Sequence, residues 1–310
     1  MKIGLSIVVP LYNEEECVKH LYGKILASVE KIGKPFEIIF VDDGSSDGTF
    51  SKSADLAKED IRLRVIKFRR NYGQTAAMSA GIEHARGDVI ITMDGDLQND
   101  PDDIHLFLEK IEEGYDIVCG WRHKRKDKLL TRKIPSKVAN WIIGKITGVP
   151  IKDNGCSLKA YRRDVIQEIP LYSDMHRFIP AMTTLAGTKI TEIKVNHHPR
   201  QFGVSKYGIS RIYKVIIDLI VIKTIISFSS RPLHFFGGLG TVSMIIGLLT
   251  FFLPLFGVLK YGGNLDFMVA SGALLFVILS CFLFLIGILS ELMVKTGETL
   301  NFAQVKKIVG

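Results

Sequence analysis

Two aspartates one residue apart end an apolar run in the segment Ile90-Ile91-Thr92-Met93-Asp94-Gly95-Asp96-Leu97-Gln98. Because side chains alternate along a strand, Asp94 and Asp96 would lie on one face. Hard cations such as Mg2+ and Mn2+ bind carboxylate oxygens together with the phosphate oxygens of a substrate. We expect Gly95, which has no side chain, to let a ligand approach the backbone. The segment predicts a divalent-metal and diphosphate site, although two aspartates at this spacing also occur in ordinary surface turns.

Two further polar clusters follow apolar runs nearer the N-terminus. Residues 5–9 lead into Pro10-Leu11-Tyr12-Asn13-Glu14-Glu15, and residues 36–41 lead into Asp42-Asp43-Gly44-Ser45-Ser46-Asp47-Gly48-Thr49. Short, continuous apolar runs bounded by turn residues are typical of buried parallel strands. Each of the three polar clusters therefore lies where a predicted strand ends.

Strand and helix patterns alternate along this part of the chain. Besides the runs already named, strands are predicted at residues 63–68, 88–93 and 116–120, and helices at residues 17–32, 74–85 and 101–112. This alternation predicts a doubly wound α/β sheet. Ligands of such sheets bind beyond the carboxyl ends of the strands, so we expect the three polar clusters to face one another.

Taken in order, the three clusters resemble those of the inverting family 2 glycosyltransferases, which bind nucleotide sugars on the Rossmann-like GT-A fold. The resemblance covers about residues 3–210. Gln98 and residues 153–163 and 200–208 are most similar to the polyprenyl-phosphate glycosyltransferases, which include dolichol-phosphate mannose synthases and bactoprenol glucosyltransferases. No Gln-x-x-Arg-Trp occurs in the chain. Processive polysaccharide synthases usually carry that motif, so chain polymerisation is disfavoured.

The resemblance implies a place for each part of the reaction. The base and ribose of the donor would lie near Pro10, Tyr12, Glu14 and Asp43, with Asp94 on the nucleotide side. Mg2+ or Mn2+ would be bound by Asp96 and Gln98. The acceptor phosphate would lie among basic residues, namely Arg122, Arg132, Arg200 and Lys206. The predicted catalytic residues are Asp96, Arg122 and Asp153, of which Asp153 is a candidate base, a carboxylate that orients the sugar, or the partner of a nearby arginine.

The acceptor that the resemblance implies is a polyprenyl monophosphate. The second pKa of such a phosphate is about 6, so much of it is dianionic at neutral pH and needs little help from a base. In-line attack would invert the anomeric centre. Similarity to bacterial glucosyltransferases at Trp121-Arg122 and Thr131-Arg132-Lys133 favours UDP-glucose over GDP-mannose. Two alternatives stay open: transfer to a hydroxyl lipid such as a diacylglycerol or glycolipid, with Asp153 as a true base, and a non-catalytic membrane scaffold.

The apolar residues are concentrated near the C-terminus. Residues 235–258 and 267–290 each run for about 24 residues without Asp, Glu, Lys or Arg, and roughly 20 suffice for a membrane-spanning helix. The short polar segment between them predicts a two-helix transmembrane hairpin. We therefore expect four parts: a GT-A domain (1–208), a juxtamembrane region (209–230), the hairpin (231–293) and a tail (294–310) in which residues 299–302 would form a short strand.

Basic residues flank the predicted hairpin. Lys214, Lys223 and Arg231 precede it, and Lys295, Lys306 and Lys307 follow it, against Lys260 alone in the loop. Since basic flanks favour the cytoplasmic side, we expect an integral membrane protein with its catalytic domain and both termini in the cytoplasm. The N-terminus leads directly into a strand and predicts no signal peptide. Four cysteines without paired spacing fit reduced thiols.

The net charge of +8 limits the expected partners, and much of the excess lies in residues 122–133. A basic surface attracts anionic lipid, although a run of charges is also commonly only a solvated face. Nucleic acid is not expected, because no nucleic-acid-binding module is recognised. Residues 209–228 have amphipathic helical spacing and would lie among lipid headgroups or pack on protein. The resemblance further suggests a homotetramer.

Overall fold

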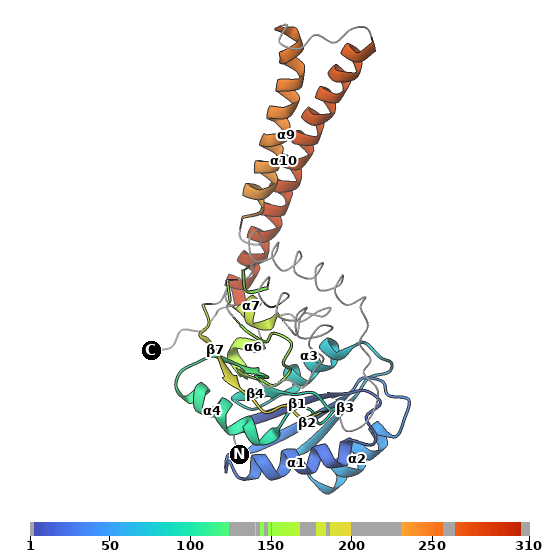
Figure 1. Ribbon diagram of the computed structural model, residues 1–310, viewed down its shortest axis with the longest axis vertical. Helices are drawn as coiled ribbons and strands as arrows, with labels where there is room; N and C mark the ends of the chain where they lie inside the picture. The colour runs from blue at the N-terminus through green and yellow to red at the C-terminus, as the bar shows by residue number, and fades with distance from the viewer. Residues whose placement is uncertain are drawn as a thin grey trace. The chain divides into compact units, whose positions relative to one another are not determined.

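The computed structural model describes residues 3–123, 140, 143–145, 148–149, 151–167, 178–183, 187–199, 231–256 and 264–304. The chain divides into two compact units, Met1–Ile222 and Lys223–Gly310 (Figure 1). Three predicted phosphate-binding residues, Arg132, Arg200 and Lys206, lie outside the described residues, as does the predicted juxtamembrane region.

A seven-stranded sheet forms the centre of the first unit. Its strands are β1 (Leu5–Leu11), β2 (Phe36–Asp42), β3 (Leu63–Lys67), β4 (Val89–Thr92), β5 (Ile117–Trp121), β6 (Lys159–Arg162) and β7 (Ile190–Lys194). Their order in the sheet is β3-β2-β1-β4-β6-β5-β7. Strand β6 runs antiparallel to β4 and β5, whereas the other neighbouring pairs are parallel. The carboxyl ends of β1, β2, β4 and β5 therefore share one edge.

Helices cover both faces of this sheet. They are α1 (Val18–Glu30), α2 (Thr49–Glu59), α3 (Gln74–His84), the 3-10 turn η1 (Pro101–Asp103) that leads into α4 (Ile104–Glu112), α6 (Arg163–Ile166) and α7 (Ile179–Thr183). Figure 1 shows α1, α2 and α4 on one face and α3 on the other. The strands and helices predicted for this unit are confirmed to within two residues at each end, but β6, β7 and the helices α2, α6 and α7 were not predicted.

Both faces of β1 and β2 are buried, which explains their continuous apolar runs. Ile7 and Phe40 belong to one core cluster with α1 and α4 residues such as Leu21 and Phe107. Their neighbours in sequence point to the opposite face, where α3 packs closely at Gly81. A Cβ on Gly81 would lie 2.3 Å from Val8 Cγ1 and 3.2 Å from Val41 Cγ2. The helix can approach this closely only because Gly81 has no side chain.

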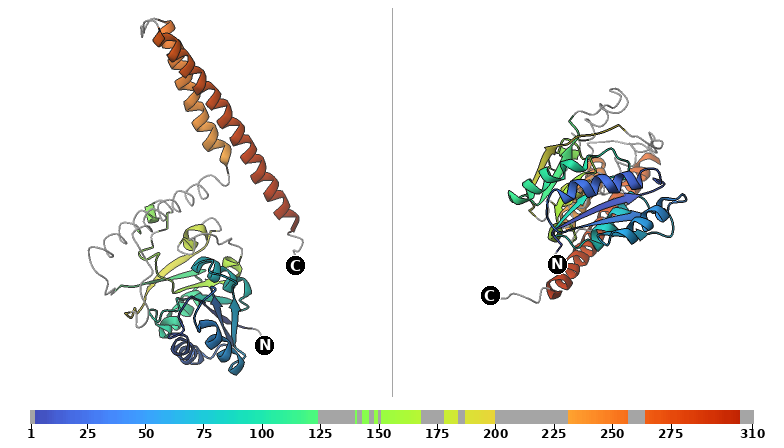
Figure 2. Two further views of the ribbon diagram at one scale, coloured as in Figure 1. Left: turned by 90° about the vertical axis from the view of Figure 1, so that its right-hand side faces the viewer. Right: turned by 90° about the horizontal axis from the view of Figure 1, so that it is seen from below.

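The second unit contains two long apolar helices, α9 (Pro232–Leu255) and α10 (Asn264–Gln304), which lie side by side in Figures 1 and 2. Two segments within them, Pro232–Leu253 and Met268–Val294, are long and apolar enough to cross a membrane. In the most apolar 18-residue stretch of each, only 22% and 17% of the residues are buried. A core helix of a soluble protein would be mostly buried, so these helices are consistent with the predicted transmembrane hairpin.

Small residues bring α9 and α10 together. A Cβ on Gly240 would lie 3.0 Å from the ring of Phe284, and one on Gly247 would lie 3.1 Å from the carbonyl oxygen of Ala273. Two serines hydrogen-bond across the pair: Ser243 Oγ donates to Phe276 O at 2.8 Å and Ser280 Oγ donates to Gly240 O at 2.7 Å. Small residues and serine hydroxyls are the usual means by which helices associate in lipid.

The predicted strand at residues 299–302 is wrong, because α10 continues through Gln304. A strand needs a partner to satisfy its backbone, whereas a helix satisfies most backbone groups internally. The helix is therefore the conformation that continues from the long apolar segment of α10 without a further partner.

Substituting Gly81 by alanine should destabilise the protein by about 1–3 kcal/mol, the usual cost of adding a methyl group to a packed contact. Valine side chains cannot swing aside easily because their χ1 is restricted. Thermal unfolding of the detergent-solubilised protein measures the effect. Gly23→Ala is the matched control, since a Cβ on Gly23 in α1 would have nothing within 4 Å, and it should be neutral or stabilising. Equal melting temperatures for Gly81→Ala and wild type would contradict the tight α3 contact.

Candidate active site

The loops that follow β1 and β2 are tied to each other. Asn13 N donates to Ser45 Oγ at 2.9 Å, and Asn13 Oδ1 accepts from Ser46 N at 2.9 Å. Next to it, Glu14 N donates to Thr49 Oγ1 at 2.9 Å. Asn13 has a φ of 52°, a left-handed conformation in which asparagine is enriched. These contacts fix the backbone on either side of Asn13, where the predicted nucleotide-binding residues Tyr12 and Glu14 lie.

Asp43 holds the loop that leads into α3. Its Oδ1 accepts from Tyr72 N at 2.7 Å and its Oδ2 accepts from Gly73 N at 2.9 Å. The residue is 3% exposed. Burial raises the pKa of Asp43, and the two N–H donors only partly oppose that effect. In this arrangement Asp43 positions the 72–73 backbone, and its predicted contact with the nucleotide stays a prediction.

The aspartate loop after β4 is anchored from below by Leu97. Leu97 has a φ of 61°, which is unusual for a residue other than glycine, and its side chain is 2% exposed within the core. Asp96 is 7% exposed, and its Oδ1 accepts from Gln98 N at 3.2 Å. The buried leucine therefore fixes the backbone between the two predicted metal-binding residues.

Gly95 has a packing role in this loop, and its predicted close approach to a ligand stays a prediction. A Cβ there would lie 2.5 Å from Leu11 Cδ2 and 3.1 Å from Pro10 O. The missing side chain thus lets the aspartate loop pack against the end of β1. The same contact brings the β1 cluster and the aspartate cluster together, as the sheet topology predicted.

Two side chains on other elements hold this loop. Gln74, the first residue of α3, donates from Nε2 to Asp94 Oδ1. Gln98 pairs with the segment before Arg200. Its backbone carbonyl accepts from His198 N at 2.9 Å, and its side-chain Nε2 donates to His198 O at 3.4 Å. His198 Nε2 is 2.9 Å from Asp100 Oδ2. The loop is thereby braced by α3 on one side and by residues 197–198 on the other.

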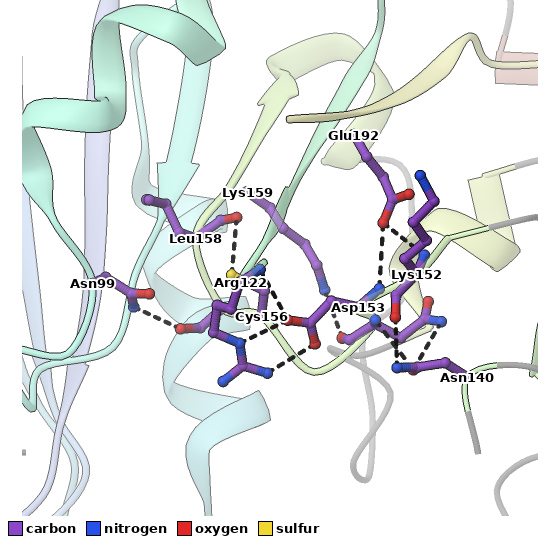
Figure 3. Close-up of polar contacts among 11 residues, drawn as sticks. Asn99, Arg122, Asn140, Lys152, Asp153, Cys156, Leu158, Lys159 and Glu192 are labelled. Atoms are coloured by element: carbon purple, nitrogen blue, oxygen red, sulfur yellow. Dashed lines mark hydrogen bonds and ion pairs between the residues drawn. The ribbon is translucent and has the colours of Figure 1, made fainter. Parts of the chain in front are cut away.

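At the end of β5, Arg122 forms a bidentate ion pair with Asp153 (Figure 3). Arg122 Nε donates to Asp153 Oδ2 at 2.8 Å and Nη2 donates to Oδ1 at 2.8 Å. The two side chains are 14% and 4% exposed. Burial disfavours the charged guanidinium, but the hydrogen bonds and charge of Asp153 raise the pKa of Arg122, so it stays protonated. Of the three roles considered for Asp153, the described geometry contains the pairing with an arginine.

The residues of the aspartate loop fit a hard divalent cation. Asp96 offers a carboxylate, and Gln98 offers the side-chain oxygen that is left when its nitrogen bonds His198. Among the described residues no group of three or more His, Cys, Asp or Glu could hold a metal ion. An ion here would therefore need oxygens from a diphosphate and water, which is the usual coordination of Mg2+ on one or two carboxylates.

Three residues of this site were missed in the sequence: Gln74, Lys159 and Glu192. Gln74 gave a weak signal, because it begins a predicted helix directly after the β3 loop. Lys159 and Glu192, whose side chains hydrogen-bond the backbone of residues 152–154, belong to the unpredicted strands β6 and β7. No local pattern points from these residues to Asp153, since their contacts depend on how the sheet is assembled.

The family model described as Glycosyl transferase family 2 matches residues 6–170, just over half of the chain. The chain belongs to glycosyltransferase family 2. The matched segment runs from the second residue of β1 through β6 and includes all the described candidate residues except Glu192. The predicted enzyme class is thereby confirmed, and the non-catalytic scaffold is disfavoured.

Two curated relatives of this glycosyltransferase span most of its length. Dodecaprenyl-phosphate galacturonate synthase of Rhizobium johnstonii is 47% identical over 252 residues, which are 79% of this chain and 75% of that protein. Undecaprenyl-phosphate 4-deoxy-4-formamido-L-arabinose transferase of Salmonella enteritidis is 39% identical over 244 residues, 78% of this chain and 73% of that protein. Both names confirm the resemblance to polyprenyl-phosphate glycosyltransferases.

A solved structure shows the same fold. The crystal structure of glucosyl-3-phosphoglycerate synthase from Mycobacterium tuberculosis, in complex with Mn2+, uridine diphosphate and phosphoglyceric acid, superposes with a TM-score of 0.56. Its sequence is 16% identical, and the match covers 72% of this chain and 78% of that chain. At this identity the likeness concerns the fold alone, and it confirms the predicted GT-A architecture.

Replacing Gln74 by alanine should weaken metal-dependent nucleotide binding about tenfold, because Asp94 loses the donor that orients it. Calorimetric titration of uridine diphosphate in the presence of Mn2+ measures the change. Gln74→Glu should weaken binding further, since a second carboxylate would then face Asp94. Binding that is unchanged in both variants would show that Gln74 does not position Asp94 for the nucleotide.

Proposed function

We propose that this family 2 glycosyltransferase transfers one sugar from a nucleotide-diphosphate sugar to a polyprenyl phosphate, with a divalent cation, at a membrane. The observation that carries the proposal is the buried Arg122–Asp153 pair at the carboxyl edge of the sheet. It places a fixed cation at the edge that also carries the predicted nucleotide and metal residues.

Arg122 keeps donors for a second anion. Asp153 accepts from Nε and from Nη2, and a guanidinium has five N–H groups in a planar fork. One N–H of Nη1 and the second N–H of Nη2 form the end-on edge of that fork, which can bind a second anion in a bidentate manner. Within the described part of the chain no acceptor is hydrogen-bonded to this edge, and its geometry suits a phosphate. This supports the predicted contact with the acceptor phosphate.

The same ion pair favours a phosphate acceptor over a hydroxyl acceptor. A general base must have a free oxygen within reach of the proton that it removes. Both carboxylate oxygens of Asp153 already accept hydrogen bonds from the guanidinium of Arg122. A phosphate dianion needs no such base, because its oxygen is already ionised at neutral pH. Asp153 is therefore proposed to orient Arg122.

The donor would bind at the carboxyl ends of β1, β2 and β4, where Pro10, Tyr12, Glu14 and Asp94 lie. Asp96 and Gln98 would hold Mg2+ or Mn2+, which when bound would neutralise charge on the departing nucleotide diphosphate. The protein's own contribution is to hold two anionic substrates in line, and positioning of this kind lowers a barrier by several kcal/mol. In-line attack by the acceptor phosphate would invert the anomeric centre.

The donor sugar is proposed as a class, a nucleotide-linked hexose or pentose. UDP-glucose is the donor predicted from the sequence. The names of the two relatives add galacturonate and 4-deoxy-4-formamido-L-arabinose as sugars to compare with it. We also propose that the catalytic domain and both termini lie in the cytoplasm, on the basis of the basic residues that flank the hairpin. A homotetrameric assembly is proposed from the family resemblance.

The proposal predicts that purified protein moves label from a nucleotide sugar into a short-chain polyprenyl phosphate when Mg2+ or Mn2+ is present. The test uses labelled UDP-glucose, UDP-galacturonate, UDP-4-deoxy-4-formamido-L-arabinose and GDP-mannose, with extraction into organic solvent. Asp96→Ala should lower transfer at least a hundredfold, because it removes a metal-binding carboxylate. If transfer occurs only with a hydroxyl lipid such as a diacylglycerol or glycolipid, the acceptor is a hydroxyl and the proposed phosphate acceptor is wrong.

Asp153→Asn separates the two acceptor classes. If Asp153 orients Arg122 for a phosphate, the variant should lose about tenfold in kcat/KM for the acceptor, because asparagine keeps one oxygen for the guanidinium. If Asp153 were a general base, the loss should reach about 10²–10⁴-fold. Steady-state rates with polyprenyl phosphate decide the question, and Asp55→Asn, an exposed aspartate on α2, controls for the substitution itself.

A further inference from the structure

Three side chains from neighbouring strands stand in one row on one face of the sheet. Cys119 of β5 pairs with Lys159 of β6 and with Glu192 of β7. Paired residues on adjacent strands point to the same face. Figure 3 shows Lys159 and Glu192 reaching the loop that carries Asp153 from two different strands. The row thus lies beneath the loop that orients Arg122.

Glu192 holds this loop through its backbone nitrogens. Its Oε1 accepts from Lys152 N at 2.7 Å and from Asp153 N at 3.3 Å. Burial raises the pKa of Glu192, while the two N–H donors and the Lys152 charge oppose this effect. One oxygen of the half-buried Glu192 carboxylate thus binds two consecutive backbone amides, and this fixes the direction of the chain at Asp153.

Lys159 holds the same loop through a carbonyl. Its Nζ donates to Asn154 O at 3.3 Å, and the residue is 2% exposed. A buried ammonium costs free energy unless it is paired or hydrogen-bonded, so lysine is rarely buried in this way. Lys159 therefore supplies a positive anchor one residue after the amides that Glu192 holds.

Cys119 separates the two charged side chains. Burial raises the pKa of its thiol to about 12, so the group stays neutral at physiological pH. A neutral, small side chain between Lys159 and Glu192 leaves each of them directed at the loop. The loop is then held by an acceptor on its N–H side and by a donor on its C=O side.

We propose that Lys159 and Glu192 are positioning residues that hold the 152–154 backbone between opposite charges and thereby fix Arg122 for the acceptor phosphate. The proposal rests on the proposed function for its kinetic part. Asp153 contributes both backbone and side chain to this chain of contacts: its amide binds Glu192 and its carboxylate binds Arg122. A loop shift of about 1 Å would move the guanidinium by a similar amount, and such misplacement can cost about a hundredfold in rate.

The test compares Glu192→Ala, Glu192→Gln and Lys159→Met in the full-length protein. Glu192→Ala should raise the acceptor KM and lower kcat/KM for the acceptor by about 10–100-fold, with the Kd of uridine diphosphate and Mn2+ within about twofold of wild type. Glu192→Gln keeps an oxygen for both amides and should recover most of that loss. Lys159→Met should resemble Glu192→Ala. Glu109→Ala, an exposed glutamate on α4, is the control and should match wild type.

Hydrogen exchange gives a readout that does not depend on catalysis. The amides of Lys152 and Asp153 should be protected in wild type and in Glu192→Gln, and should exchange at least tenfold faster in Glu192→Ala, while peptides from β1 and β2 stay protected. If wild type transfers no sugar to polyprenyl phosphate, the proposed function fails. The exchange rates then test on their own whether Glu192 holds the backbone of residues 152–154. Unchanged exchange in Glu192→Ala, or equal losses in donor and acceptor binding, would overturn the positioning role.

Discussion

Burying a charged guanidinium is costly unless a carboxylate pairs with it, and Asp153 offsets this cost for Arg122 at the edge of the sheet. Several neighbouring strands and loops position the two residues of this ion pair. Strand β5 delivers Arg122, the segment before β6 delivers Asp153, and β6 and β7 each contribute a side chain that holds residues 152–154. The insertion of β6 as an antiparallel strand between β4 and β5 brings these parts to one place. Without that strand order, residues 31 positions apart in sequence would not meet.

The sequence was most informative where burial is complete. Strands β1 and β2 are buried on both faces, and their unbroken apolar runs made them easy to predict. Strand β6 reads Lys-Ala-Tyr-Arg and carries a charge at each end, so no strand pattern was visible there, although Lys159 is buried. Hydrophobic periodicity cannot find a strand whose inward-facing residue is an ammonium.

The candidate site, too, could be predicted from the sequence only in part. The polar clusters after β1, β2 and β4 could be placed together in advance, because parallel strands end at a common edge. Side-chain partners could not be placed. Gln74 beside Asp94, and Gly95 against Leu11, depend on distances between loops that local pattern does not encode. A glycine next to two aspartates predicts close ligand approach from the sequence, whereas its packing against Leu11 is visible only once the loops are placed.

The packing of Leu97 limits which substitutions the aspartate loop can accept. Its left-handed backbone would suit glycine better, yet its buried side chain ties the aspartate loop to the core. A substitution that relieved the backbone would release the anchor, and one that kept the anchor must accept the strain. At position 97 two contributions to stability therefore oppose each other, the strain of a left-handed backbone and the burial of the side chain, and no single residue type satisfies both.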